Sequence, residues 1–214
     1  MESVAAYIDA YNLYHSLKEN NWKRYYWLDI PSLLQNLLRP NQKLTTVYYF
    51  TSTSPMPGSK KRQQIYIEAL ETNSLRNQIF FKTIRGKFKP EDIVCNTCND
   101  YAFCRSCDEL ITIYHEKETD VNISVKMISD AYQELYDTVL LLTADSDQVG
   151  TIKTIKEYER KVGVVLPPGR NSKDLEGVAD FYKHISQNDL GKNQLPGIVI
   201  KSSGYQLLKP IEWN

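Results

Sequence analysis

Residues 139–147, VLLLTADSD, place a short apolar run directly before two carboxylates. A run that is apolar on both faces is typical of a strand in the middle of a parallel sheet, where helices cover both sides. Asp145 and Asp147 follow this run at once. One interpretation is that they begin the next helix, because acids cap helix N-termini and favour the helix dipole. The other is that they share a bound cation.

Strand and helix patterns alternate on both sides of this stretch. Apolar, β-branched and aromatic runs predict strands at 4–10, 43–52, 78–88, 138–143 and 161–167, with extended structure at 109–117 and a short strand at 197–200. Helical spacing predicts helices at 29–38, 58–73, 119–135, 145–159 and 175–185, with Thr119 as the N-cap of the third. This alternation predicts an α/β fold, a parallel sheet with helices on both faces.

Length and composition indicate a single globular unit with one insert. The 214 residues suffice for one good-sized core, and the 26 basic and 26 acidic residues give a formal net charge of zero. We expect one domain over residues 1–187, interrupted by a small insert at 90–108. Residues 188–214 are expected to form a C-terminal loop and extension, beginning with a polar loop at 188–197.

The N-terminal residues show no signal peptide, and no apolar run approaches the length of a membrane span. We therefore expect a cytoplasmic protein without a membrane partner. The oligomeric state stays open, a homodimer included.

The insert contains all four cysteines, in the pattern CNTCNDYAFCRSC. Two Cys-x₂-Cys pairs can place four thiolates around Zn²⁺, so Cys95, Cys98, Cys104 and Cys107 are predicted to form a closed, structural zinc site. The alternatives are two local disulfides or a redox dithiol, for which a single pair would suffice.

Carboxylates follow several predicted strands or open the helix after one. Asp9 ends the first strand, Asp145 and Asp147 end the fifth, and Asp120 lies in the first turn of a helix. Sites in open parallel sheets form outside the carboxyl ends of the strands, so these acids are expected at one edge. Close like charges cost free energy unless a cation neutralises them, and Mg²⁺ or Mn²⁺ with oxygen ligands would do so. Asp120 and the two later acids could also be ordinary helix-start residues.

Three segments together, YIDAYNLYHSL, EKETDVNISVKMISDA and VLLLTADSDQVG, resemble the NYN domain of the PIN-like nuclease superfamily. The resemblance covers about residues 4–185 and implies a metal-dependent ribonuclease on a parallel α/β sheet. By matching position, it implies that Asp9, Asp120 and Asp145 bind the metal. Asp147 would hold a ligand or a water, and Asn12 would be a polar neighbour. The chain departs from the family at Ala10 and Ala144, where glycine is frequent.

The expected function is hydrolysis of phosphodiester bonds in RNA, with single-stranded RNA as the expected substrate, by a metal-activated water. Basic residues such as Arg85 and Arg170 could contact phosphates or could be solvated surface charge, and both interpretations stay open. Tyr11 and Tyr14 could stack on a splayed base or could pack at the core or rim. The alternative function is a non-catalytic RNA-binding or protein-interaction module with the same fold.

Overall fold

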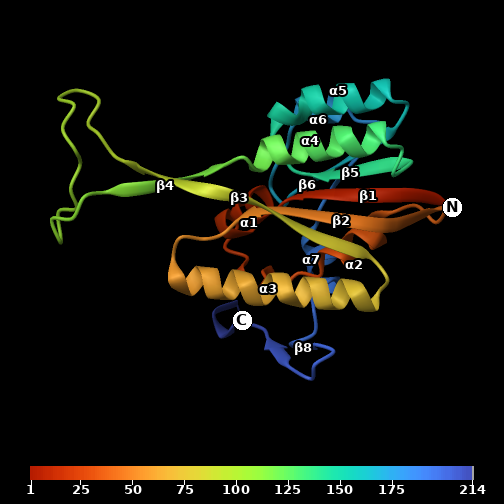
Figure 1. The fold of residues 1–214 in the computed structure, drawn as a ribbon, viewed down its shortest axis with the longest axis horizontal. Helices are drawn as coiled ribbons and strands as arrows, with labels where there is room; N and C mark the ends of the chain where they lie inside the picture. The colour runs from red at the N-terminus through yellow and green to blue at the C-terminus, as the bar shows by residue number, and fades with distance from the viewer. Residues whose placement is uncertain (214) are drawn as a thin grey trace.

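The computed structural model describes residues 1–213 as a three-layer α/β arrangement around a seven-stranded sheet (Figure 1). Its strands are β1 (Glu2–Asp9), β2 (Gln42–Ser52), β3 (Phe80–Asp92), β4 (Thr112–Lys117), β5 (Thr138–Leu142), β6 (Lys161–Leu166) and β7 (Phe181–His184). The strand order is β4-β3-β2-β1-β5-β6-β7. All neighbours are parallel except β3 and β4. The predicted α/β fold with a mostly parallel sheet is confirmed.

Helices cover both faces of this sheet, as its doubly apolar strands require. The α-helices are α1 (Ala10–Glu19), α2 (Ile30–Leu37), α3 (Pro57–Arg76), α4 (Thr119–Tyr132), α5 (Val149–Glu157), α6 (Lys173–Val178) and α7 (Gln187–Lys192). Short 3-10 turns are η1 (Lys23–Tyr25), η2 (Ser146–Gln148) and η3 (Ile211–Trp213). Helices α4, α5 and α6 pack on one face, whereas α1, α2, α3 and α7 pack on the other (Figure 1).

Alternate residues of β1 enter the two separate cores. Tyr7 is fully buried against α4 and its neighbours, and Ile8 is fully buried on the opposite face. The side-chain period of two in a strand gives this result directly. Asp9 therefore follows Tyr7 onto the α4 face of the sheet, at the carboxyl end of the strand.

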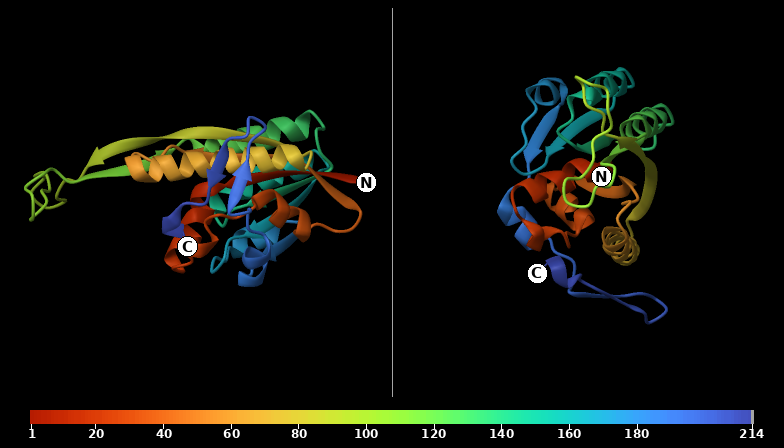
Figure 2. Two further views of the ribbon diagram at one scale, coloured as in Figure 1. Left: turned by 90° about the horizontal axis from the view of Figure 1, so that it is seen from below. Right: turned by 90° about the vertical axis from the view of Figure 1, so that its left-hand side faces the viewer.

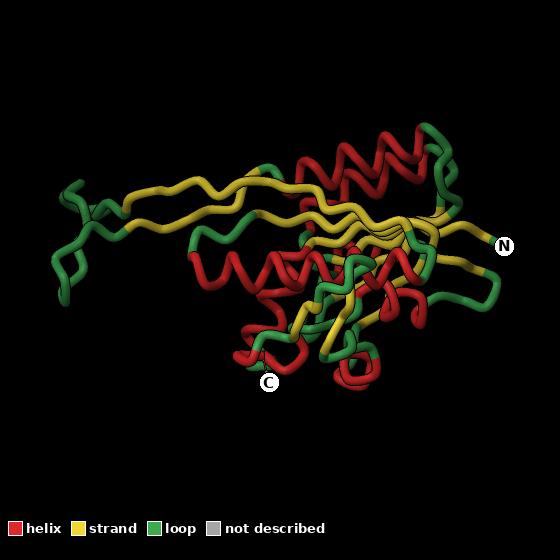
Figure 3. The backbone as a smooth tube through the Cα atoms, turned by 60° about the horizontal axis from the view of Figure 1, so that its bottom comes forward, coloured by secondary structure: helices red, strands yellow, loops and turns green. Residues whose placement is uncertain are grey.

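A long two-stranded arm leaves the body at the carboxyl edge of the sheet (Figures 1 and 2). The first half of β3 pairs with β2, from Phe80 to Gly86, and its second half pairs with β4 from Lys87 to Asp92. The cysteine-rich residues between β3 and β4 form the loops at the tip of this arm (Figure 3). The insert is therefore a projection of the sheet.

Two predicted elements differ from the structure. Residues 175–185 were expected to be one helix, but α6 ends at Val178 and β7 begins at Phe181. The ring of Phe181 lies where a Cβ on Gly163 would be, so the missing side chain of Gly163 allows β7 to pack against β6. Asp180 also fixes this junction, because its carboxylate accepts a hydrogen bond from Val162 N at 2.8 Å.

The second difference concerns the start and end of α4. Glu118, not Thr119, precedes the helix, in a left-handed conformation with φ of 75°. The Thr119 hydroxyl donates instead to Glu116 Oε1 at 2.9 Å. Ile123, Met127 and Ala131 form the buried face as predicted, whereas Leu135 lies beyond the helix and is exposed.

The C-terminal segment carries structure where a polar loop was expected. Helix α7 begins at Gln187 behind a capping box made by Ser186 and Asp189. The predicted strand near residue 198 forms β8 (Ile198–Ile200), which pairs with β9 (Gln206–Leu208) in a separate hairpin. None of the described helices is both long and apolar enough to span a bilayer.

Candidate functional site

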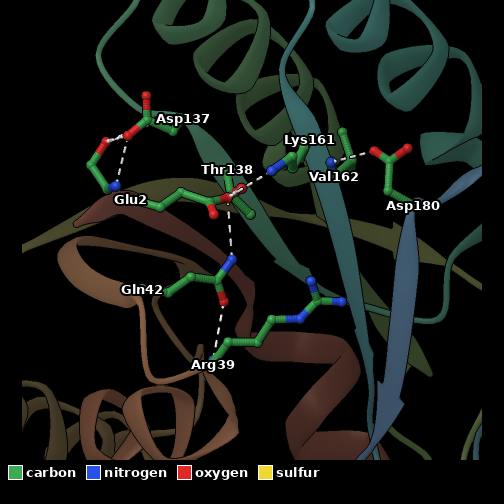
Figure 4. A network of polar contacts seen from close by, with 9 residues as sticks. Glu2, Arg39, Gln42, Asp137, Thr138, Lys161, Val162 and Asp180 are labelled. Carbon is green, nitrogen blue, oxygen red and sulfur yellow. Dashed lines mark hydrogen bonds and ion pairs between the residues drawn. The ribbon is translucent and has the colours of Figure 1, made fainter.

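Acidic side chains at the amino end of the sheet are paired (Figure 4). Glu2 accepts hydrogen bonds from Thr138 and Gln42, and Lys161 lies 3.6 Å from its carboxylate. The bond from Thr138, with the others, lowers the pKa of Glu2. Bonds from the backbone and hydroxyl of Ser3 likewise lower the pKa of Asp137. These two acids are charged and paired, and their bonds link neighbouring strands of the sheet.

The carboxyl end of the sheet instead contains acidic side chains without cationic partners, around a cavity of about 300 Å³ that we call the acid cavity. Its lining combines residues from β1, α1, β4, α4 and the exit of β5: Asp9, Tyr11, Asn12, Tyr114, His115, Glu116, Thr119, Asp120 and Asp145. Among the residues that the structure describes, no lysine, arginine or histidine forms an ion pair with Asp9, Glu116, Asp120 or Asp145. Three of the four predicted acids, Asp9, Asp120 and Asp145, line this cavity, whereas Asp147 is not part of the lining.

Asp9 is the most buried of these acids, with 5% of its surface exposed. It caps α1 by accepting from Asn12 N at 2.9 Å, and its other oxygen accepts from Thr143 Oγ1 at 2.9 Å. Burial raises the pKa of Asp9 to about 6 despite these bonds, and the charges of Asp120 and Glu116 act in the same direction. A negative charge at this position is therefore costly in the protein alone.

Asp145 and Asp120 face Asp9 from other elements. Asp145 caps η2 by accepting from Asp147 N at 3.0 Å, so the simple interpretation of the TADSD segment as a helix start is correct. Asp145 also lines the cavity, so capping accounts for only part of its environment. Burial raises the pKa of Asp120, and the carboxylates of Asp145 and Asp147 raise it further.

Hydrogen bonds between the loops fix the geometry of this edge. Thr143 Oγ1 donates to Asp9 and accepts from Asp145 N at 3.2 Å, which links the ends of β1 and β5. Asn12 Oδ1 accepts from Ala144 N at 3.2 Å, which ties α1 to the same exit. The alanine backbone at position 144 therefore makes a specific contact with the predicted site residue Asn12.

Glu116 is a site residue that the sequence analysis missed. Burial raises its pKa, opposed by the hydroxyls of Ser52 and Thr119, and the charge of Asp120 adds to the increase. A signal was present, because the two-residue period of TIYHEK places Tyr114 and Glu116 on one face of a strand that leads straight to Asp120. Recognising it required knowing that β4 runs antiparallel back to the carboxyl edge.

Gly86 permits the close approach of β3 to this corner. A Cβ at Gly86 would lie 2.6 Å from Lys117 O, 2.7 Å from Thr119 Oγ1 and 2.9 Å from Ser52 Oγ. Any side chain at this position would displace the segment that carries Glu116 and begins α4. Glycine is needed here for space, since only the absence of a side chain leaves room.

Two predicted phosphate-contacting residues lie outside the lining of the acid cavity. Arg170 Nη2 lies 2.6 Å from both carboxylate oxygens of Glu19. Arg85 Nη1 donates to Thr53 Oγ1 at 2.9 Å. Asp147 also lies outside the lining, and it acts on the site through its charge on Asp120 and its backbone bond to Asp145.

The cysteines at the tip of the arm form two similar turns. Cys95 N bonds Asp100 O and Asn99 N bonds Cys95 O, and the same pattern recurs with Cys104, Asp108 and Glu109. Hydrogen bonds from Cys98 and Thr97 lower the pKa of Cys95 to about 7. All four thiols are free, so the alternative of two disulfides is not what the structure contains. Within residues 1–213, no three or more of these thiols are placed together as a ready-made metal site.

A second, larger cavity of about 470 Å³ lies beside the acid cavity, and Tyr11 lines both. We call it the tyrosine cavity because its lining includes Tyr11, Tyr14, Tyr26, Tyr49, Tyr66 and Phe88. Tyr26, Tyr49 and Tyr66 are buried, whereas Tyr11 and Tyr14 are 39% and 43% exposed. The aromatic residues, Trp213 included, come from α1, β2, α3, β3, the turn after η1, and η3, so only the fold brings them together.

The carboxyl edge of this α/β sheet gathers acidic side chains from distant segments, and within residues 1–213 none of Asp9, Glu116, Asp120 and Asp145 is paired with a cationic side chain. The chain belongs to the NYN domain family, whose model matches residues 3–187, and this family lies within the PIN-like nuclease superfamily.

Two further proteins are similar to this chain. One is the 6-hydroxy-3-succinoylpyridine 3-monooxygenase HspA of Pseudomonas putida (strain DSM 28022 / S16), 24% identical over 234 residues, with 97% of this chain and 74% of that protein covered. The other is the crystal structure of a protein of unknown function from Vibrio parahaemolyticus RIMD 2210633, with a TM-score of 0.52 and 19% identity. That match covers 87% of this chain and 94% of the other, and it shows a shared fold.

Proposed function

We propose that the protein is a metal-dependent ribonuclease that hydrolyses phosphodiester bonds in single-stranded RNA. The observation that supports this most is the acid cavity, where the buried carboxylate of Asp9 shares one lining with the less buried carboxylates of Asp120 and Asp145, from distant segments, without a lysine or arginine in that lining. Such a group is tolerable as anions when a bound cation compensates the charge. Membership of the NYN family supports the same proposal.

The donor set suits Mg²⁺ or Mn²⁺. No three His, Cys, Asp or Glu side chains within residues 1–213 are placed as a ready-made metal centre. Mg²⁺ keeps several waters and uses only one or two carboxylates directly, so carboxylates spaced around a cavity of about 300 Å³ fit it. When bound, such an ion would polarise the phosphodiester and lower the pKa of a water.

The residues would divide the work by position. Asp9 and Asp145 are held by Thr143 and would be the first ligands, with Asp120 beside them. Glu116 and Asp147 would hold and orient water, since both carboxylates are near Asp120. Asn12 would keep the two loops in register through Ala144. Arg85 and Arg170 stay predicted phosphate contacts.

Cleavage of an end-labelled single-stranded RNA tests this proposal. We expect cleavage with Mg²⁺ or Mn²⁺, none with EDTA, and none with the Asp145→Asn protein purified in the same way. Equal cleavage by Asp145→Asn, or cleavage in EDTA, would show that the activity is a contaminant or uses other chemistry. Binding of RNA with no cleavage of any substrate would favour the non-catalytic alternative.

A second candidate function is hydroxylation of a free heteroaromatic ring, favoured by the tyrosine cavity and by the alignment with HspA over almost the whole chain. Hydroxylation by O₂ needs a two-electron donor, such as a reduced nicotinamide, supplied from solution. Oxygen uptake with a hydroxypyridine and a reduced nicotinamide measures it. No uptake above the protein-free rate would reject this candidate.

At the tip of the arm, we propose a structural Zn²⁺ held by Cys95, Cys98, Cys104 and Cys107. Two observations support it: the repeated turn geometry and the lowered pKa of Cys95 and Cys104. The thiolate is the form that binds metal, so both features favour binding. Because metal binding and local folding are coupled, closure of the two pairs around one ion would accompany binding.

A further inference from the structure

The tyrosine cavity is large and is not filled by the described chain. At about 470 Å³ it lies within the range of roughly 300–1,000 Å³ that is usual for small-molecule sites. Its buried part is formed by Tyr26, Tyr49 and Tyr66, whereas Tyr11 and Tyr14 stand at the exposed side. A cavity with aromatic walls suits a flat, polarisable ring, because such a ring stacks on aromatic faces.

The position of this cavity relates it to the acid cavity. Tyr11 lines both, and it follows Asp9 by two residues at the start of α1. Ser52 lines the tyrosine cavity and lies close enough to Glu116, which lines the acid cavity, to influence the pKa of that carboxyl. A molecule with a flat ring and a phosphodiester a short distance apart could therefore occupy both cavities at once.

Cationic side chains lie at the tyrosine cavity but not among the acids. Lys18 and Lys23 line it and are exposed, and within residues 1–213 neither forms an ion pair. Arg62 also lines it, but it is paired with Glu212 at 2.9 Å. Free lysines beside an aromatic cavity suit an anionic chain that carries bases, because lysines contact phosphates without reading sequence.

We propose that the tyrosine cavity binds one base of the RNA strand whose neighbouring phosphodiester lies in the acid cavity. The base stacks on the aromatic lining of the cavity at its exposed side, and Lys18 and Lys23 contact the phosphates on its other side. This inference rests on the proposed function for the position of the scissile phosphate, but binding of the base can be measured without cleavage. Aromatic stacking tolerates all four bases, so the site selects single-stranded over paired RNA.

Fluorescence of short single-stranded RNA carrying 2-aminopurine tests the inference. The Asp145→Asn protein in Mg²⁺ serves as the binding partner, so that the RNA stays intact. We expect the fluorescence to be quenched on binding when the probe occupies one particular position of the strand. An abasic site at that position should weaken binding by about tenfold, within the usual contribution of one stacked base.

Variants of the cavity identify where the base binds. Tyr14→Leu and Phe88→Leu keep apolar bulk and remove a ring, so both should weaken binding of the intact RNA by about tenfold and reduce the quenching. They should not weaken binding of the abasic RNA further. Tyr205→Leu is the matched control, because Tyr205 is 64% exposed and lies between β8 and β9, outside the lining of both cavities.

The outcomes separate this inference from the proposed nuclease. Metal-dependent cleavage combined with equal binding of abasic and intact RNA would overturn the base site and leave the nuclease standing. Base-dependent binding that Tyr14→Leu abolishes, without cleavage by the wild-type protein, would support the site and reject the nuclease. Binding of a free base or hydroxypyridine, with no effect of Tyr14→Leu on RNA, would overturn the assignment to RNA.

Discussion

Tyr7 Oη donates a hydrogen bond of 2.6 Å to Asp130 Oδ2 in the buried interface between β1 and α4. Lys126 lies 2.6 Å from the other oxygen of Asp130, and its ammonium lies 4.5 Å from the ring centre of Tyr48. Tyr7 is on the strand that ends at Asp9, and Asp130 is on the helix that begins beside Asp120. This bond therefore joins the two elements that carry opposing acids of the cavity.

Removing this hydroxyl should destabilise the protein. Tyr7→Phe leaves the buried carboxylate of Asp130 with Lys126 alone, and we expect a loss of about 1.5–3 kcal/mol, the usual range for a bond to a charged group. Urea denaturation measures it. Tyr136→Phe is the control, because Tyr136 donates to the neutral carbonyl of Met127 at 2.9 Å and should cost less. Equal losses would show that the charge of Asp130 adds nothing.

Neutralising the cavity acids should abolish cleavage without unfolding the protein. We expect Asp9→Asn, Asp120→Asn and Asp145→Asn each to reduce the rate by at least about 100-fold, since each removes a metal-binding charge. Glu116→Gln should reduce it less, because in the proposed site Glu116 orients a water and does not bind the metal directly. Initial rates and circular dichroism measure these effects. A wild-type cleavage rate in Asp9→Asn would show that Asp9, the most buried acid, does not take part in catalysis.

The stability of the metal-free protein should fall as the pH rises through about 6. Folding raises the pKa of Asp9 from 3.8 to about 6, because the buried carboxyl is more easily held in its neutral form. The contribution of this group to the free energy of unfolding is therefore fully present below pH 4 and is lost as the pH rises to 6. That shift corresponds to a loss of about 3 kcal/mol. Asp9→Asn should lack this loss, and Tm in EDTA at several pH values measures it.

Mg²⁺ should restore the Tm of the wild-type protein at neutral pH. It should raise the Tm of Asp9→Asn less, because that protein has no charge at this position for the ion to compensate. The same Tm dependence on pH in both metal-free proteins would show that another group titrates.

A side chain at position 86 should disrupt the corner that carries Glu116. Gly86→Ala places a Cβ against Lys117 O, Thr119 Oγ1 and Ser52 Oγ, and we expect a loss of about 1–3 kcal/mol from overpacking. Gly150→Ala is the control, because no atom lies within 4 Å of the added Cβ and alanine favours the helix α5. Chemical denaturation of both variants measures the contrast, and unchanged stability of Gly86→Ala would contradict the close approach.

The cysteine tip should carry one Zn²⁺ per chain. Native mass spectrometry and elemental analysis measure the content, and Cys95→Ser or Cys104→Ser should release the metal, since each removes one of four ligands. Ser106→Ala, a change in the same turn that keeps every thiol, should retain it. Zinc retained in both cysteine variants would place the metal elsewhere.

Local patterns of sequence identified the acids, because Asp9 and Asp145 each follow an apolar strand and the carboxyl ends of parallel strands must meet at one edge. Glu116 escaped because its position depends on the reversal of β4 along β3, which no local pattern encodes. The sequence did not predict β7, because the spacing after Leu175 is helical whereas the packing of Phe181 over Gly163 decides the structure. The tyrosine cavity was also hidden, since its walls come from six separate segments.

The ladder between β3 and β4 ends at the pair formed by Asp92 and Thr112, far along the arm from Glu116. The Thr112 hydroxyl donates to Asp92 Oδ1 at 2.8 Å, so a side-chain hydrogen bond joins this last residue pair of the two strands. A chain shortened there and rejoined by a two-residue hairpin turn would keep every residue that lines the acid cavity. This shortened protein would show which part of RNA binding and cleavage depends on the cysteine tip and which part the edge of the sheet supports alone.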